Sequence, residues 1–128
     1  MLVRVILPML LYRLLPTEDR LRRAAMPLFT EPEDPAFGPA LRHLRLDAGL
    51  PRMATEEELG GFGGPVAVFA AAEDALFPAR EVLPRARKIF PNLALAEFLE
   101  GCRHVPSKAA LRRVNERVLA FLAEPDGT

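Results

Sequence analysis

The sequence lacks a charge excess of either sign and has almost no cysteine. Lys plus Arg and Asp plus Glu both number 17 among 128 residues, so the formal net charge is zero. A nucleic-acid-binding surface needs a clustered basic excess, and nothing in this composition indicates such a partner. The one cysteine, Cys102, cannot form an intrachain disulfide framework. A reducing, cytoplasmic setting is therefore expected.

The chain also lacks an apolar run long enough to cross a membrane. Residues 2–15 are strongly apolar, but Arg4, Pro8 and Arg13 interrupt them and Pro16 ends the run. A membrane span needs about 20 apolar residues, and a secretory signal needs a clean apolar stretch with a small-residue cleavage site. We therefore expect a helix that packs on other protein. A start this apolar also suggests that upstream polypeptide is missing.

The pattern of the chain changes near Gly60. The hydrophobic content of 50% is enough for one modest core. Residues 1–59 have the pattern of helices and loops, residues 60–64 form a Gly-rich joint, and residues 65–128 alternate strand and helix patterns. We expect three segments with these bounds and no nucleotide-binding glycine loop, because the joint lacks a lysine and the required strand-then-helix context.

Four helices are expected before the joint. The first covers residues 2–15, Thr17 caps the second, and Pro27 and Pro32 end it. The third begins at Asp34-Pro35, buries Leu41 and Leu44, and ends near Ala48 before a Gly49 C-cap. Thr55 and Glu58 form a capping box for a short fourth helix.

After the joint, the pattern predicts strand, helix, strand, helix. Residues 66–72 are continuously apolar, which is typical of an interior parallel strand buried on both faces. A helix at about 79–90 should kink or restart at Pro84, a second strand covers residues 93–99, and a last helix covers residues 107–123. Its apolar positions share one face: Leu111, Val114, Val118, Phe121 and Leu122. A strand–helix–strand unit almost always makes parallel strands, so the fold class is α/β.

Two residues at the predicted strand ends carry the chemistry. Asp74 follows the first strand and His104 follows the second. Parallel strands place these ends at one edge of the sheet, where open α/β sheets bind ligands. A carboxylate there can orient an imidazole and stabilise the imidazolium that it forms. Alone, Asp74 could simply make an Asx turn and His104 could be an ordinary loop histidine; their joint placement favours a catalytic pair.

These residues resemble a known family. The segment from Ala71 to Pro78, Ala-Ala-Glu-Asp-Ala-Leu-Phe-Pro, is similar to the acid segment of α/β-hydrolases, and Gly101-Cys102-Arg103-His104 resembles their histidine turn. The order, acid before histidine, also agrees. The resemblance covers residues 65–123, and residues 1–59 look loosely like the helical cap inserted before that region. It implies the C-terminal part of an α/β-hydrolase that acts on an ester or related bond of a small-molecule substrate, with Asp74 and His104 as catalytic residues and no cofactor.

The family's nucleophile is missing from this chain. α/β-Hydrolases carry it in a Gly-x-Ser-x-Gly elbow, whereas the one serine here, Ser107, lies at a helix start without flanking glycines. Thr17, Thr30 and Thr55 have the positions of caps or loop residues, Thr128 is terminal, and nothing near Cys102 would lower its pKa. We expect the isolated chain to be inactive.

Three interpretations remain open. In the first, the chain is a hydrolase without its N-terminal half. In the second, it is a non-catalytic binding module or one half of a split complex, which predicts a homodimer or an N-terminal partner because a two-stranded sheet is poorly stable alone. In the third, it is a metal-assisted hydrolase that uses His104 and Asp74. No paired cysteine or histidine spacing supports a metal site. His43, between Arg42 and Arg45, is expected to be solvated.

Overall fold

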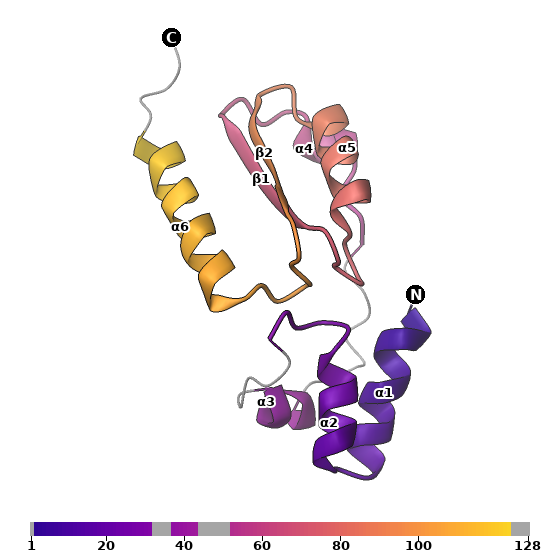
Figure 1. The fold of residues 1–128 in the computed structure, drawn as a ribbon. Coiled ribbons are helices and arrows are strands. Elements are labelled where there is room, and N and C mark those ends of the chain that lie inside the picture. The colour runs from indigo at the N-terminus through magenta and orange to yellow at the C-terminus, as the bar shows by residue number, and fades with distance from the viewer. Residues whose placement is uncertain (1, 32–36, 44–51, 124–128) are drawn as a thin grey trace.

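The computed structural model describes residues 2–31, 37–43 and 52–123. The described elements are α1 (Leu2–Leu14), α2 (Glu18–Ala25), α3 (Phe37–His43), α4 (Glu56–Leu59), β1 (Val66–Ala71), α5 (Ala79–Ile89), β2 (Leu93–Leu99) and α6 (Lys108–Ala123). The strand–helix–strand–helix order after the joint agrees with the α/β prediction. In Figure 1, α5 and α6 lie on opposite sides of the sheet, and α1, α2 and α3 gather near the loops that follow the strands.

The sheet consists, within the described residues, of β1 and β2 alone. The two strands are parallel, with Ala67 opposite Leu95 and Ala71 opposite Leu99. The prediction of parallel strands is therefore confirmed. Both chain segments that leave the strand ends, residues 72–78 and 100–107, lie at the same edge of the sheet.

The expectation that β1 is buried on both faces is wrong for most of its length. Ala70 and Ala71 are buried, but the preceding residues 66–69 are only partly buried. On one face α5 packs well, through Ala79 and Leu83. On the other face Ala110 is the one residue of α6 that is fully buried, and it packs with Ala71 at the end of the strand.

The apolar face of α6 is correspondingly open. Leu111 and Leu122 are 43% and 71% exposed, although the sequence pattern puts them on the face expected to pack. Val114, Val118 and Phe121 are partly buried. The helix thus presents more apolar surface than the two described strands can cover.

The sequence predicts a kink or a restart at Pro84; helix α5 runs without interruption through this residue, so the restart is wrong and the kink stays a prediction. Pro84 lacks the N–H that would bond the carbonyl of Arg80, and it lies on the exposed face of the helix. Leu83, Ala86 and Ile89 on the opposite face are buried. Their packing holds the helix on the sheet across the proline.

The helical region has its own core. Val5, Met9 and Tyr12, spaced by four and three, form the buried face of α1 and pack in one cluster with residues of α2 and α3. Leu41 is 1% exposed, as predicted. The expected helix start at Asp34-Pro35 and its end, with Leu44, Ala48 and Gly49, lie outside the described residues. None of the described helices is long and apolar enough to span a bilayer.

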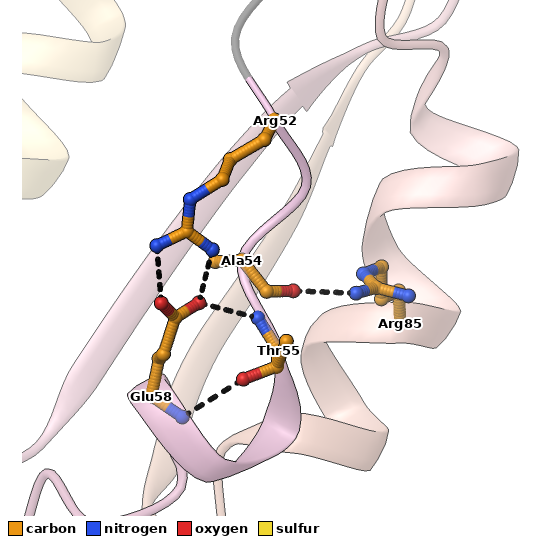
Figure 2. Close-up of polar contacts among 5 residues, drawn as sticks. All are labelled: Arg52, Ala54, Thr55, Glu58 and Arg85. Atoms are coloured by element: carbon orange, nitrogen blue, oxygen red, sulfur yellow. Dashed lines mark hydrogen bonds and ion pairs between the residues drawn. The ribbon is translucent and has the colours of Figure 1, made fainter.

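The N-caps predicted at Thr17 and Thr55 are confirmed, and the cap predicted at Asp34 lies outside the described residues. The Thr17 hydroxyl accepts a hydrogen bond from the Arg20 N–H. At α4, the Thr55 hydroxyl accepts from the Glu58 N–H and the Glu58 carboxylate accepts from the Thr55 N–H, which is the capping box. Figure 2 shows Arg52 paired with the same carboxylate, while Arg85 of α5 donates to the Ala54 carbonyl at 2.6 Å. These contacts tie the segment before the joint to α5.

A short backbone bridge joins the helical region to the loop after β2. The Val105 N–H donates to the Leu28 carbonyl at 2.7 Å, and the Thr30 N–H donates to the Val105 carbonyl at 2.9 Å. The Thr30 hydroxyl accepts from the Arg103 N–H at 2.9 Å. We call these bonds between residues 28–30 and 103–105 the loop bridge. Because they flank His104 on both sides, they fix the backbone that carries it.

Replacing Thr30 tests the loop bridge. Thr30→Val leaves the partly buried Arg103 N–H without its acceptor, and we expect a loss of about 1–3 kcal/mol in the free energy of unfolding, measured by urea denaturation. Thr30→Ser keeps the hydroxyl and should retain most of the stability. Equal stabilities of the two variants would show that this hydrogen bond contributes nothing.

Candidate functional site

Asp74 uses its two carboxylate oxygens for different contacts. Its Oδ1 accepts from the backbone N–H groups of Leu76 and Phe77, at 2.7 and 3.0 Å, which closes the turn after β1. Its Oδ2 faces His104. The Asx turn, which the sequence offered as an alternative role for Asp74, is therefore present together with the histidine contact. The turn orients Oδ2 toward His104.

His104 reaches Asp74 because of the turn that precedes it. Gly101 has φ +66°, a left-handed conformation that suits glycine, and it reverses the chain directly after β2. The Glu73 N–H donates to the Cys102 carbonyl at 2.9 Å, so the two loops are joined next to the pair. His104 Nδ1 then lies 3.0 Å from Asp74 Oδ2.

The two side chains differ in exposure. The Asp74 side chain is 9% exposed and the His104 side chain 37%. Burial by itself would raise the pKa of Asp74, but the hydrogen bonds from Phe77, Leu76 and His104 together lower that pKa below its usual value. Asp74 is thus an anion at neutral pH, placed to hold the imidazole.

The remaining ring nitrogen of His104 is available. Nε2 makes no hydrogen bond within the part of the chain that the structure describes. The Phe77 ring lies beside the imidazole, with centroids 6.0 Å apart, and Phe77 is 46% exposed. An imidazole held at Nδ1 by a carboxylate, with Nε2 open, has the arrangement of a general base.

No described serine or threonine hydroxyl, and no described thiol, forms a hydrogen bond with His104. The Ser107 hydroxyl accepts from the Ala110 N–H and caps α6. Cys102 is 3% exposed and packs in an apolar cluster with Ala71 and Ala110. Thr17, Thr30 and Thr55 make the cap and loop-bridge contacts described above, and Thr128 lies outside the described residues.

A metal centre finds no support in the described ranges. No group of three or more His, Cys, Asp or Glu residues there could hold a metal ion. His43 is exposed, as expected. The metal-assisted interpretation would therefore depend on ligands from elsewhere.

Several residues around the pair were not anticipated from the sequence. A cavity of 390 Å³ adjoins Asp74, with Arg4, Arg80 and Arg103 in its wall. The Arg103 guanidinium donates to the Met26 and Phe29 carbonyls and lies 3.7 Å from Glu73. Arg103 is next to His104 in the sequence, which was the one available signal; Arg4 lies 70 residues before Asp74 and gave none.

Comparison with known proteins supports the fold. No protein-family model matches the sequence, and no curated protein matches it significantly. Among solved structures, the chain is similar to naproxen esterase (carboxylesterase NP) from Bacillus subtilis, with a TM-score of 0.65 and 20% sequence identity. The match covers 91% of this chain and 45% of the esterase, so the chain spans about half the length of that structure. The fold is thus like part of the fold of that esterase.

Acid titration tests the environment of Asp74. Because its pKa is lowered in the folded state, ionised Asp74 favours folding above the ordinary carboxyl pKa of about 3.9, and this contribution disappears as pH falls through the folded-state pKa. Asp74→Asn keeps an oxygen acceptor for Leu76 and Phe77 but cannot ionise. We expect its free energy of unfolding to fall less than that of the wild type between pH 5 and pH 3.

The matched control is Glu116→Gln, an exposed position on α6, which should follow the wild-type curve. Parallel curves for Asp74→Asn and the wild type, measured by urea denaturation at each pH, would contradict the assignment.

Proposed function

We propose that this chain carries the acid and histidine of an ester-hydrolysing site of the α/β-hydrolase type. The observation that carries the proposal is the 3.0 Å contact between His104 Nδ1 and Asp74 Oδ2 at the carboxyl edge of two parallel strands. The similarity to part of a carboxylesterase supports the same class. The substrate would be a small molecule with an ester or related bond.

In this proposal His104 is the general base and acid. Its Nε2 takes the proton of an attacking hydroxyl and later returns it to the leaving group. Asp74 holds the imidazole through Nδ1 and stabilises the imidazolium. Helices α1, α2 and α3 correspond to the cap, since the loop bridge joins the segment that follows α2 to the loop that carries His104.

The nucleophile is proposed to come from polypeptide other than these 128 residues, in the same chain or in a partner. The described sheet has two strands, so the outer edge of β1 is unpaired, and such edges pair readily with further strands. Residues of α1 and the following turn also expose apolar side chains, namely Val3, Leu7, Leu10, Leu11, Leu14 and Leu15. These surfaces are where the rest of a hydrolase core, or a partner half, would attach.

The same surfaces favour a second candidate, a non-catalytic interaction module. Exposed apolar area on α1 and α6 needs a partner whether or not chemistry follows. The two candidates differ in the role of His104: an interaction module would tolerate its replacement, and a hydrolase would not.

The isolated 128-residue chain should hydrolyse an unactivated ester such as ethyl butyrate no faster than buffer, because the described residues place no hydroxyl or thiol for His104 to activate. A p-nitrophenyl ester is unsuitable, since an exposed imidazole attacks it directly. The measurement is the initial rate at neutral pH, with His104→Ala as the matched control. Robust turnover by the wild type that His104→Ala abolishes would show that a nucleophile is present after all.

The positive test is on the native assembly. We expect the gene product from its source cells either to have a mass above 14.2 kDa or to be bound to a second polypeptide with a Gly-x-Ser-x-Gly elbow. In either case the native assembly should hydrolyse esters. Asp74→Asn should lower that turnover by about 10⁴-fold, as expected for the acid of a serine triad. An assembly whose esterase activity survives Asp74→Asn and His104→Ala would reject the hydrolase proposal.

A further inference from the structure

The cavity beside Asp74 lies where the helical region meets the sheet. Its wall combines Arg4 of α1, the turn after α2, the segment after β1, Arg80 of α5 and Arg103 of the loop after β2. Its volume of 390 Å³ is within the range of small-molecule sites. A cavity built from five parts of the chain, next to the proposed acid, is a candidate binding site.

Positive charge predominates in this wall. Three arginines face two carboxylates, those of Glu73 and Asp74. Asp74 is engaged by His104, and Glu73 lies 3.7 Å from Arg103, whose guanidinium also bonds two backbone carbonyls. The two arginines of the wall that have no carboxylate partner within it are Arg4 and Arg80.

Neither of these arginines has a strong partner. Arg4 makes no hydrogen bond or ion pair with the part of the chain that the structure describes. Arg80 has its neighbour Glu81 at 3.8 Å, and both side chains are about two-thirds exposed or more, at 72% and 67%. Two arginines from different helices thus line one cavity, Arg4 without a partner among the described residues and Arg80 with one long, exposed ion pair.

The rest of the wall is apolar. Met26 and Pro27 come from the turn after α2, and Ala72 and Ala75 from the segment after β1. An apolar wall with two cationic side chains suits a ligand that has a hydrocarbon body and an anionic end.

We propose that this cavity binds a carboxylate-bearing apolar small molecule, with Arg4 and Arg80 pairing the carboxylate. A monoanion is favoured over a dianion such as phosphate, because Glu73 and Asp74 also border the cavity and would repel the second charge. If the chain belongs to a hydrolase, the ligand would be either a substrate with a carboxylate remote from its ester bond or the acid product. This assignment of the ligand rests on the proposed function, whereas the binding site does not depend on it.

Binding of benzoate and of its neutral analogue benzamide to the 128-residue chain tests the proposal. Shifts of the backbone amide resonances of residues 72–75 report on the cavity. We expect benzoate to bind about 5- to 10-fold more tightly than benzamide, since each exposed charge pair contributes modestly. Higher salt should weaken benzoate binding alone.

Matched variants locate the site. Arg4→Gln and Arg80→Gln should each weaken benzoate binding by about 2- to 5-fold without changing benzamide binding. Arg87→Gln, at an exposed position of α5 outside the cavity, should change neither. Equal affinities for benzoate and benzamide, equal effects of all three substitutions, or tighter binding of inorganic phosphate would overturn the proposal.

The outcome is separable from hydrolysis. Benzoate binding needs no nucleophile, so a chain that binds benzoate as predicted while its native assembly hydrolyses no ester would refute the proposed function and leave the anion site standing. An active assembly whose chain shows no benzoate preference would do the reverse.

Discussion

The loop bridge between residues 28–30 and 103–105 is the interaction on which the rest of the site depends. It is made of backbone hydrogen bonds and the Thr30 hydroxyl, so it constrains position without depending on long, flexible side chains. It sets the backbone on both sides of His104, while Ala75 and Leu76, just after Asp74, pack against the helical core. One junction therefore anchors the loops of both proposed catalytic residues to the same helices.

Asp74 contributes both to the turn after β1 and to the contact with His104. One oxygen holds the turn after β1 and the other holds the imidazole, so distortion of the turn would misplace the acid. The Asp74 side chain is little exposed, whereas the His104 side chain keeps 37% of its surface exposed. The open Nε2, the exposed Phe77 ring and the unpaired strand edge all lie at surfaces that further polypeptide or substrate would cover. In the proposed function, Asp74 and His104 are the acid and histidine of a site whose nucleophile comes from other polypeptide.

The features of the fold that depend on local sequence patterns were predictable from the sequence. The β2 bounds, the Thr55–Glu58 capping box and the placement of Asp74 and His104 at one sheet edge follow from residues close together in the chain. The Thr30–Arg103 contact joins residues 73 apart, and Arg4 reaches the cavity only through helix packing, so no local signal could reveal either. The burial of β1 was overestimated because an apolar sequence shows only that a strand is suited to burial. It does not show how many strands and helices pack around it. At Pro84, packing of Leu83 and Ala86 outweighed the local preference of proline.

The most direct test of the central claim is the tautomer of neutral His104, read from the ring ¹⁵N shifts of the 128-residue chain, with His43→Asn leaving one imidazole to observe. If Asp74 Oδ2 accepts from His104, the proton of the neutral ring must reside on Nδ1, and Nε2 must be unprotonated and able to act as a base. We predict the Nδ1–H tautomer, and its loss in Asp74→Ala. A ring protonated on Nε2 in the wild type would contradict the catalytic pairing of Asp74 with His104.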